Sequence, residues 1–597
     1  MHGGPGRVMD PSRCLASLPA KQEGVAIMTT GMDGVSRRDI FRTAAAGGIA
    51  LALAPGTAMA QAGAGSADAA PISAATVTGI VFDDTAGDGS RKPDSRGIPG
   101  VLVSNGREIA VTDIGGHYSL PVGDETVVFV IKPSGYMTPL EPGSMLPRFH
   151  YIHQPNGSPA SLDLTFAGIA PTGPLPASVD FPLRRQDEPK SFEVVLFTDP
   201  QPETDVEVDF IREDVLAPLR GTRARFGMTL GDLMFDDLSL YGRYNALVGT
   251  IGLPWYNIGG NHDLNFEAPD RRHSRETFKR VFGPSYYAFH YADAVFVMLD
   301  DVDYLGTDRT KPHGAGKYEG RLDPAQLDFV RNLLAHVPDD TLIVLTLHIP
   351  LATYLSDNSS ENLTDRAELF KILAGRRYTL SLSGHTHTTE HHYFGEAEGF
   401  VSPVPHHHHI LTAVSGSWWS GPFDHRGVAV ADSRDGTPNG FHILSVEGNR
   451  YTTRFVPAKE PEGRQIRVSV ESQFHGEMRR DTRPGTPLQP RLSHTAARAA
   501  TVVANVFDGG PKTAVSLTIG EAAPVAMVPR GRPDPFVEDV YARNEATKKP
   551  WVKAETSSHV WTARLPPLGP GIYPMVVEAV NEYGATVSTR QALELEG

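Results

Sequence analysis

The sequence predicts a multidomain protein in which a central α/β domain lies between an N-terminal β-sandwich and a C-terminal β-rich domain. Residues 73–185 and 440–597 contain short β-branched runs separated by Gly and Pro turns, a pattern typical of small β-sandwiches. Residues 191–425 instead alternate short apolar runs with segments of helical periodicity. Because this alternation is typical of strands connected by helices, the middle region is expected to be α/β.

Composition and charge narrow the class of protein. The 597 residues include 55 Lys and Arg and 70 Asp and Glu, which gives a formal net charge of −15, and 40% of them are apolar. An ordinary apolar fraction excludes a disordered chain and a multi-pass membrane protein. The acidic balance argues against a clear nucleic-acid-binding surface, which requires clustered basic residues. Cys14 is the single cysteine, so no intramolecular disulfide can form.

Residues 1–60 have the pattern of an export leader. Arg37 and Arg38 precede a 12-residue apolar stretch, Thr43–Ala54, and Ala58-Met59-Ala60 supplies small residues for cleavage. The paired arginines resemble the twin-arginine class of signal peptides, so we expect a periplasmic or secreted protein. The apolar stretch is shorter than the roughly 20 residues of a membrane-spanning helix, and no transmembrane anchor is expected in the mature chain. The alternative is a cytosolic protein with an Ala/Gly-rich tail.

The start of translation is open between Met1, Met28 and Met32, because the leader pattern begins unusually far from the first residue. In the N-terminal domain, Thr76–Phe82 and Val127–Ile131 are expected strands. An acidic loop follows the first of these strands and contains Asp83, Asp84, Asp88 and Asp94. Oxygen ligands at loop spacing suit Ca²⁺, although a solvated acidic loop explains the same pattern.

Five apolar runs of the central domain each end in residues that can bind a metal ion. The runs and their endings are Phe192–Thr198 before Asp199-Pro200-Gln201, Arg225–Leu230 before Gly231-Asp232, Trp255–Ile258 before Gly259-Gly260-Asn261-His262-Asp263, Thr341–Leu347 before His348, and Tyr378–Ser383 before Gly384-His385-Thr386-His387. The carboxyl ends of parallel strands lie along one edge of an open α/β sheet. We therefore expect all five groups to converge on one site. A further helix is expected after Asp323-Pro324, an N-cap acid followed by Pro at the first helical position.

The candidate ligands number seven and contain oxygen and imidazole donors but no thiolate. They are Asp199, Gln201, Asp232, Asn261, His348, His385 and His387. This donor set suits Mn, Fe or Zn. Seven ligands are too many for one four-coordinate ion, whereas two ions about 3.5–4 Å apart that share a carboxylate would use them all.

Taken in order, these motifs resemble the calcineurin-like metallophosphoesterase family, and the match covers about residues 191–425. The flanking β domains resemble secreted bacterial members, and the segments Ser415–Gly421 and Asp435–Gly440 strengthen that narrower match. The resemblance implies a central α/β metallophosphoesterase sandwich. It implies that Asp199, Gln201 and His387 hold one ion, that Asp232 bridges, and that Asn261, His348 and His385 hold the other. It also implies that His262 contacts the phosphate and protonates the leaving oxygen, with Asp263 orienting it.

Gln201 departs from the family pattern, which usually has His at this position. An amide oxygen is a weaker and harder ligand than imidazole, so the first site should favour Mn²⁺ or Fe²⁺, with Zn²⁺ as the alternative. A second interpretation is that Gln201 binds no metal.

Several other residues have two interpretations. Trp418 and Trp419 are adjacent and point to opposite faces if extended, so one ring is expected in the core while the other lines the mouth of the site as a substrate-binding residue. The run His406–His409 is either a solvated loop or a strand neighbour of the site, and His391 and His392 share this ambiguity. Asp236 and Asp237 either orient ligands or begin a helix.

The function that these observations favour is an exported two-metal phosphoesterase. It would hydrolyse a phosphoester, a diester rather than a monoester, by attack of a metal-bridging hydroxide. The absence of an arginine motif beside the ligands gives the preference for a diester. The substrate is a phosphoester, and an envelope-derived one fits the expected location. The alternative is an inactive or weakly active binding or scaffold protein of the cell envelope.

Overall fold

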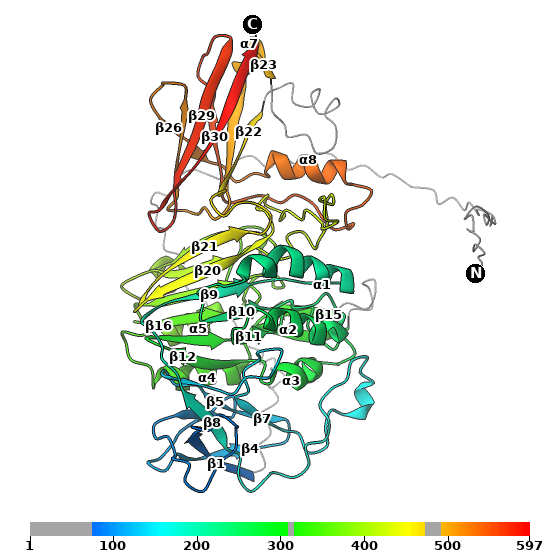
Figure 1. Cartoon of the computed structure of the whole chain (residues 1–597), viewed down its shortest axis with the longest axis vertical. Coiled ribbons are helices and arrows are strands. Elements are labelled where there is room, and N and C mark those ends of the chain that lie inside the picture. The colour runs from blue at the N-terminus through cyan, green and yellow to red at the C-terminus, as the bar shows by residue number, and fades with distance from the viewer. Residues whose placement is uncertain (1–74, 308–315, 472–490, 597) are drawn as a thin grey trace, which may run out of the picture. The chain divides into compact units, whose positions relative to one another are not determined.

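The structure is a computed structural model that describes residues 75–307, 316–471 and 491–596 (Figure 1). The predicted leader lies outside the described residues. Within these ranges, no helix combines the length and the apolar character needed to cross a membrane. Three successive groups of sheets follow one another along the chain, so the multidomain organisation expected from the sequence is found.

The N-terminal domain contains two four-stranded sheets, with strand orders β4-β1-β8-β6 and β3-β2-β5-β7. Their strands are β1 (Ala75–Asp83), β2 (Leu102–Ser104), β3 (Ile109–Val111), β4 (His117–Val122), β5 (Thr126–Ile131), β6 (Tyr136–Met137), β7 (His150–His153) and β8 (Phe181–Arg185). Both sheets contribute to one hydrophobic cluster, for example through Val77 of β1 and Val130 of β5. The acidic loop after β1 is held by its own hydrogen bonds, because Asp84 accepts from the amides of Gly87 and Gly89 at 2.9 Å each. Calcium binding by this loop stays a prediction.

The central domain is built on two larger sheets. The first central sheet has the order β11-β10-β9-β20-β21, and the second central sheet has the order β12-β13-β16-β17-β19-β18. The strands of the first are β9 (Ser191–Phe197), β10 (Phe226–Leu230), β11 (Trp255–Ile258), β20 (Gly440–Glu447) and β21 (Arg450–Pro457). Those of the second are β12 (Tyr287–Tyr291), β13 (Ala294–Met298), β16 (Leu342–Thr346), β17 (Thr379–Ser383), β18 (Glu390–Phe394) and β19 (His406–Ile410).

Strand β9 shows how the core is divided. Successive side chains of a strand point to opposite faces, and here both faces are buried. Val194 and Leu196 belong to the cluster that contains the second central sheet, whereas Val195 and Phe197 belong to the cluster formed with the helices. The helices of the domain are α1 (Asp205–Ile211), α2 (Tyr241–Gly249), α3 (Glu276–Phe282), α4 (Pro324–Leu334) and α5 (Arg366–Leu373). The continuous apolar run at β9 is therefore explained by burial on two sides.

The helix expected after Asp323 is α4. The carboxylate of Asp323 accepts from the amide of Ala325 at 2.7 Å, and Pro324 occupies the first helical position. The five apolar runs before the candidate ligands are β9, β10, β11, β16 and β17, each within one residue of its expected bounds at either end. These local predictions are confirmed.

Two expectations about the sheets need correction. The five strands do not share one sheet edge, because β9, β10 and β11 lie in the first central sheet and β16 and β17 in the second. The central domain also extends past residue 425, since β20 pairs antiparallel with β9 and β21 pairs with β20. The hydrophobic pattern of β20 and β21 is that of any buried strand pair, so it did not reveal which sheet they join.

The C-terminal domain is rich in β-structure, as expected. Its sheets have the orders β22-β24-β28-β27 and β23-β30-β29-β25-β26 and share one hydrophobic cluster. The strands are β22 (Ile466–Glu471), β23 (Arg491–Ser493), β24 (Thr501–Val506), β25 (Ala514–Ile519), β26 (Val525–Ala526), β27 (Val528–Pro529), β28 (Val560–Arg564), β29 (Gly571–Val580) and β30 (Thr586–Glu596). It also contains the helices α7 (His494–Ala497) and α8 (Pro535–Arg543).

Candidate metal centre

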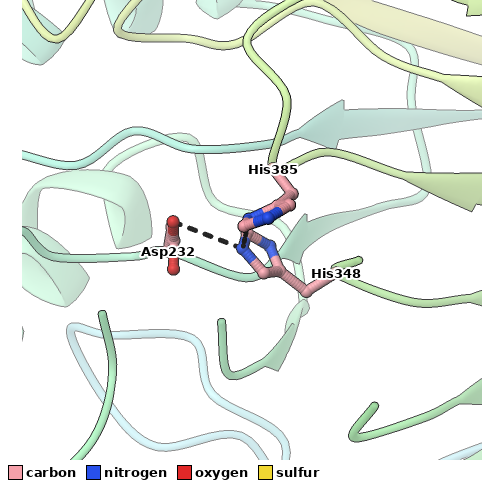
Figure 2. Close-up of side chains that lie close together, drawn as sticks. All are labelled: Asp232, His348 and His385. Carbon is pink, nitrogen blue, oxygen red and sulfur yellow. Dashed lines mark hydrogen bonds and ion pairs between the residues drawn. The ribbon is translucent and has the colours of Figure 1, made fainter. Parts of the chain in front are cut away.

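Three of the candidate ligands lie within reach of one ion. Figure 2 shows Asp232 after β10, His348 after β16 and His385 after β17, and their ligand atoms all lie within 4.8 Å of one another. His348 Nε2 is 3.3 Å from Asp232 Oδ2 and 3.2 Å from His385 Nδ1. The two central sheets therefore each contribute to this group.

Asn261 completes the same group, because its Oδ1 lies 3.0 Å from His348 Nε2. The other nitrogen of His348, Nδ1, is 3.0 Å from the carbonyl oxygen of Leu230. A carbonyl only accepts, so Nδ1 carries a proton, and Nε2 is the atom that faces the oxygens of Asp232 and Asn261 and offers a lone pair when the ring is neutral.

Asp199, Gln201 and His387 form the rest of the group around Asp232. Gln201 Nε2 donates to Asp232 Oδ2 at 2.7 Å, and His387 Nε2 is 3.7 Å from Asp199 Oδ1. His387 Nδ1 donates to the carbonyl oxygen of Gly416, so its Nε2 also offers a lone pair. Asp199 is fully buried and accepts from the His385 amide at 3.0 Å. All seven candidate ligands thus meet around Asp232.

The backbone of these loops is strained where the ligands sit. Five of the seven candidate ligands have φ in the left-handed region, and their values are 48° for Asp199, 36° for Gln201, 51° for Asp232, 75° for His385 and 52° for His387. Such conformations are uncommon for residues other than glycine and cluster at functional sites. Glycines permit the close approach that this requires. A Cβ on Gly260 would lie 2.1 Å from Asp232 Oδ1, and one on Gly384 would lie 2.2 Å from Asp199 Oδ2.

The charges of the metal-free site are unevenly balanced. Burial raises the pKa of Asp199 to about 7. Burial also opposes ionisation of Asp232, but His348 outweighs it and lowers the pKa of that carboxyl. Burial disfavours a charged His348 ring, yet the nearby Asp232 carboxylate raises the pKa of His348 to about 10. Burial lowers the pKa of His387 to about 3. The buried carboxyl groups of Asp199 and Asp232 therefore favour the presence of positive charge between the candidate ligands.

The residues present fit divalent cations. His348, His385 and His387 each give one ring nitrogen to a backbone carbonyl and turn the other toward the candidate ligands, which is how metal-binding histidines are oriented. Gln201 Oε1 is buried and has no hydrogen-bond partner. An orphaned acceptor of this kind is costly unless a cation engages it. The donor set could hold two ions, and ligation by Gln201 stays a prediction.

The expected role of Asp263 is corrected by the structure. His262 Nδ1 is 2.7 Å from Oδ1 of Asp236, and its amide donates to Asp232 Oδ1 at 2.9 Å. Asp263 is fully buried and instead accepts from the amides of Leu233 and Gly260, at 3.0 and 2.9 Å. Asp263 therefore holds the ligand loops together, whereas Asp236 orients the ring. Motif spacing alone did not distinguish them, because Asp236 lies 26 residues before His262.

The ring of His262 is partly exposed beside the ligands. Burial disfavours its charged form, but Asp232 and the hydrogen bond to Asp236 together raise the pKa of His262 to about 9. The ring stacks on Phe235 at a centroid distance of 4.7 Å, and Phe235 stacks in turn on Trp551 at 5.7 Å. Trp551 is 46% exposed and comes from the C-terminal domain, in which the sequence analysis placed no site residue.

The two adjacent tryptophans have different environments. Trp419 is buried among the helices and donates from Nε1 to the carbonyl of Pro200 at 2.9 Å, so it is the ring in the core and does not line the mouth. Trp418 is half-buried and stacks on His387 at a centroid distance of 3.9 Å. It therefore lies where the sequence placed a substrate-binding ring. Both have positive φ rather than the extended conformation assumed from their spacing.

Arg275 is a supporting residue that sequence reasoning missed. The buried guanidinium donates to the carbonyls of Gly260 and Asp263, at 2.7 and 3.0 Å, and pairs with Asp300 at 2.8 Å. It thereby fixes the loop that carries Asn261 and His262. No local pattern could have identified it, because it precedes an ordinary helix.

The run His406–His409 also differs from the favoured expectation. These residues are strand β19, and all four side chains are buried, so they form no solvated loop. His391 and His392 are buried on the neighbouring strand β18. Histidine is polar, so four consecutive histidines do not show the apolar pattern of a buried strand. This is why a loop was the favoured interpretation.

Comparison with known proteins gives three family matches in chain order. The N-terminal region of calcineurin-like phosphoesterases matches residues 85–168, the calcineurin-like phosphoesterase domain matches residues 212–389, and the C-terminal region of the family matches residues 408–586. The central match contains every candidate ligand except Asp199 and Gln201. The chain therefore belongs to the calcineurin-like phosphoesterases, and it is a hydrolase acting on phosphoester bonds.

Solved structures with a similar fold include a dimetal phosphatase from Danio rerio and a purple acid phosphatase from yellow lupin (Lupinus luteus) seeds. The first is 14% identical with a TM-score of 0.31, and the match covers 44% of this chain and 95% of that one. The second is 12% identical with a TM-score of 0.31, and the match covers 61% of this chain and 67% of that one. No curated protein matches the sequence.

Proposed function

We propose that this chain is an exported phosphodiesterase that uses two divalent cations. The observation that carries the proposal is the convergence of three histidine lone pairs, two carboxylates and two amide groups beside the partly exposed ring of His262. Mn²⁺ or Fe²⁺ suits this set better than Zn²⁺, because amide oxygens take the place of imidazole. When bound, such a pair offsets the charge of the phosphoryl oxygens and lowers the pKa of a water between them.

His262 supplies the proton for the leaving oxygen in this proposal. Asp236 binds Nδ1, so the protonated ring presents Nε2 toward the substrate. A pKa of about 9 keeps the ring protonated at neutral pH, as a general acid requires. Asp232 binds the His262 amide and so fixes the distance between the acid and the ligand group.

A diester fits the charges around the site better than a monoester does. Arg275 is paired with Asp300, Arg434 with Glu555, and Lys549 with Glu203 at 2.7 Å. These three cations are therefore occupied and do not form a clamp for a second phosphate charge. A diester carries one negative charge at the phosphorus and requires no such clamp.

The aromatic side chains around the mouth favour a leaving group with a flat or apolar part. Trp418, Phe235 and Trp551 lie next to one another and to the ligands, and Trp418 is 6.3 Å from Trp551 between centroids. Aromatic surfaces bind sugars, bases and lipid-like groups. With the twin-arginine leader, this supports an envelope-derived phosphodiester as the substrate, hydrolysed in the periplasm or outside the cell.

Hydrolysis of bis-p-nitrophenyl phosphate and p-nitrophenyl phosphate by the Mn²⁺-loaded protein tests the activity. We expect turnover of the diester to exceed that of the monoester, and to fall at least about 100-fold in His262→Ala and Asp232→Asn. The exposed His336 provides the matched control, because His336→Ala removes a histidine that is not one of the candidate ligands. Faster monoester turnover would contradict the diester preference, and equal rates in wild type and His262→Ala would contradict the role of the acid.

Replacement of Arg37 and Arg38 by lysine tests export. We expect the protein to move from the periplasmic to the cytoplasmic fraction when both arginines are replaced. An unchanged distribution would contradict the twin-arginine route.

A further inference from the structure

A second group of histidines surrounds one carboxylate oxygen, away from the ligands described above. The Nε2 atoms of His409, His442 and His391 lie 3.0, 3.3 and 3.4 Å from Oδ1 of Asp508. The three histidines are fully buried, and the side chain of Asp508 is 13% exposed. We propose that His391, His409 and Asp508 form an additional metal site, which suits Zn²⁺ and which His442 supports.

Strand pairing explains why the two histidine ligands meet. His391 of β18 and His409 of β19 are direct partners in the antiparallel register, so their side chains share one face of the second central sheet. Their rings stack at a centroid distance of 3.8 Å. The Nε2 atoms of both rings and a carboxylate oxygen of Asp508 lie within 4.8 Å of one another. One ion can therefore reach all three.

Hydrogen bonds at the far side of each ring fix the nitrogen that faces Asp508. His409 Nδ1 is 3.1 Å from the hydroxyl of Thr453. His391 Nδ1 is 2.9 Å from Nε2 of His407, whose own Nδ1 is 3.0 Å from the hydroxyl of Tyr451. With protons on the Nδ1 atoms, His391 and His409 offer Nε2 lone pairs to the space beside Asp508, as metal ligands do.

Without a cation, this arrangement leaves polar atoms unsatisfied. Nε2 of His391 and Nε2 of His409 are buried and make no hydrogen bond, although each lies within 3.4 Å of Asp508 Oδ1. In the tautomers with protons on Nδ1, each Nε2 lone pair faces the carboxylate oxygen and is repelled by it. A divalent cation turns both contacts into attractions and takes up the charge of the carboxylate.

His442 holds the carboxylate from the other side. It lies on β20 of the first central sheet, and its Nε2 donates to Asp508 Oδ1. Asp508 itself follows β24 of the C-terminal domain. Gly510 lets that loop approach, because a Cβ there would lie 2.7 Å from Cβ of His391. The proposed ion thus connects the second central sheet with the C-terminal domain, while His442 connects both with the first central sheet.

Two imidazoles and a carboxylate oxygen are ligands that Zn²⁺ accepts, with water at the remaining position. The partial exposure of Asp508 leaves access for that water. The site does not depend on the proposed function, because it shares no residue with the catalytic ligands.

Counting bound metal in matched variants tests the site. His409→Asn keeps a donor near Thr453 and removes Nε2. His406→Asn is the control on the same strand, since its Nδ1 contact with Thr379 is kept and its Nε2 contact with Ser381 is lost. After reconstitution with Zn²⁺ and removal of excess metal, we expect mass spectrometry to find one ion fewer per chain in His409→Asn than in wild type. His406→Asn should match wild type.

A background that lacks the catalytic ligands separates this site from the proposed function. In His348→Asn/His387→Asn, we expect one Zn²⁺ per chain to remain and to raise the thermal unfolding temperature by several degrees. Adding His409→Asn should abolish both effects, and adding His406→Asn should preserve them. If His409→Asn does not fold, Asp508→Ala in the loop replaces it. Equal metal content with and without His409 or Asp508 would overturn the proposal.

Discussion

Asp236 Oδ1 lies 2.7 Å from Nδ1 of His262, so the carboxylate fixes both the orientation of this ring and the nitrogen that it presents to substrate. Asp236 itself has φ of 66°, in the left-handed region that is uncommon for residues other than glycine. His262 is thus held through its amide by Asp232 and through its ring by Asp236, which lie four positions apart.

Asp236→Asn should slow the enzyme according to the leaving group. The amide cannot stabilise an imidazolium as a carboxylate does, so we expect a decrease in kcat of about tenfold to a hundredfold for an alkyl diester. The decrease should be smaller for a p-nitrophenyl diester, whose leaving group needs less protonation. Rates for both substrates in Asp236→Asn and in Asp237→Asn, the neighbouring control, would measure this. Equal losses for both substrates would show that Asp236 has only a structural role.

Gln201→His should strengthen the weaker half of the metal centre. Imidazole is a better ligand for Zn²⁺ than an amide oxygen, so we expect Zn²⁺ affinity to rise by about an order of magnitude. Competition with a chromophoric chelator would measure the affinity. Gln201→Leu serves as the comparison, because it fills the site without a ligand atom. If Gln201→Leu binds both ions as tightly as wild type, Gln201 is no ligand.

Trp551→Ala should impair substrate binding more than chemistry. The ring lies against Phe235, which stacks on His262, and an aromatic contact contributes about 0.5–1.5 kcal/mol. We therefore expect KM for an aromatic diester to rise about threefold to tenfold, with little change in kcat. Dimethyl phosphate, which has no flat group, should show no such change. A uniform loss with both substrates would instead indicate a disturbed active site.

Glu276→Gln should reduce stability in a pH-dependent way. The buried carboxylate pairs with Lys279 at 2.5 Å and accepts from Gln154 at 2.8 Å, and although burial opposes ionisation these partners lower the pKa of Glu276. Stability from a lowered carboxyl pKa is present above the unfolded pKa and is lost as pH falls through the folded one. We expect a loss of about 1.5–3 kcal/mol at pH 7 that shrinks below about pH 4.

Urea unfolding at pH 7 and at a pH below about 4 would measure the effect of Glu276→Gln on the free energy of unfolding. The control is Glu368→Gln, which breaks an exposed pair with Lys371 and should cost less than about 1 kcal/mol. A loss for Glu276→Gln that is independent of pH would show that packing, and not charge, explains it.

The strands and the candidate ligands that follow them could be predicted because the apolar run and its ligand residues are adjacent in the sequence. The run before Asp199 is apolar because β9 is buried on both faces, and the same holds for the runs before Asp232 and His348. Contacts that depend on how loops fold back could not be predicted. The pairing of His262 with Asp236 requires a left-handed residue, and a sequence pattern carries no backbone angle.

Contacts between residues that are far apart in the sequence could not be predicted either. Trp551 reaches His262 through Phe235 across nearly 300 residues, and Asp508 meets His409 across about 100. Neither residue has a distinctive local context, so a single sequence gives no reason to connect them. The four-histidine run was visible, but its burial depends on the neighbours that β19 acquires in the sheet.

The pairing of β20 with β9 has a consequence for the order in which the chain can fold. His442 is the register partner of Leu196, so this ladder closes a loop of roughly 250 residues. During synthesis, this edge of β9 has no partner until β20, which ends at Glu447, has been made. Closing so large a loop is slow, and an uncovered strand invites association with other nascent chains. We therefore expect β9 to be open to such association until about three quarters of the 597 residues have been made.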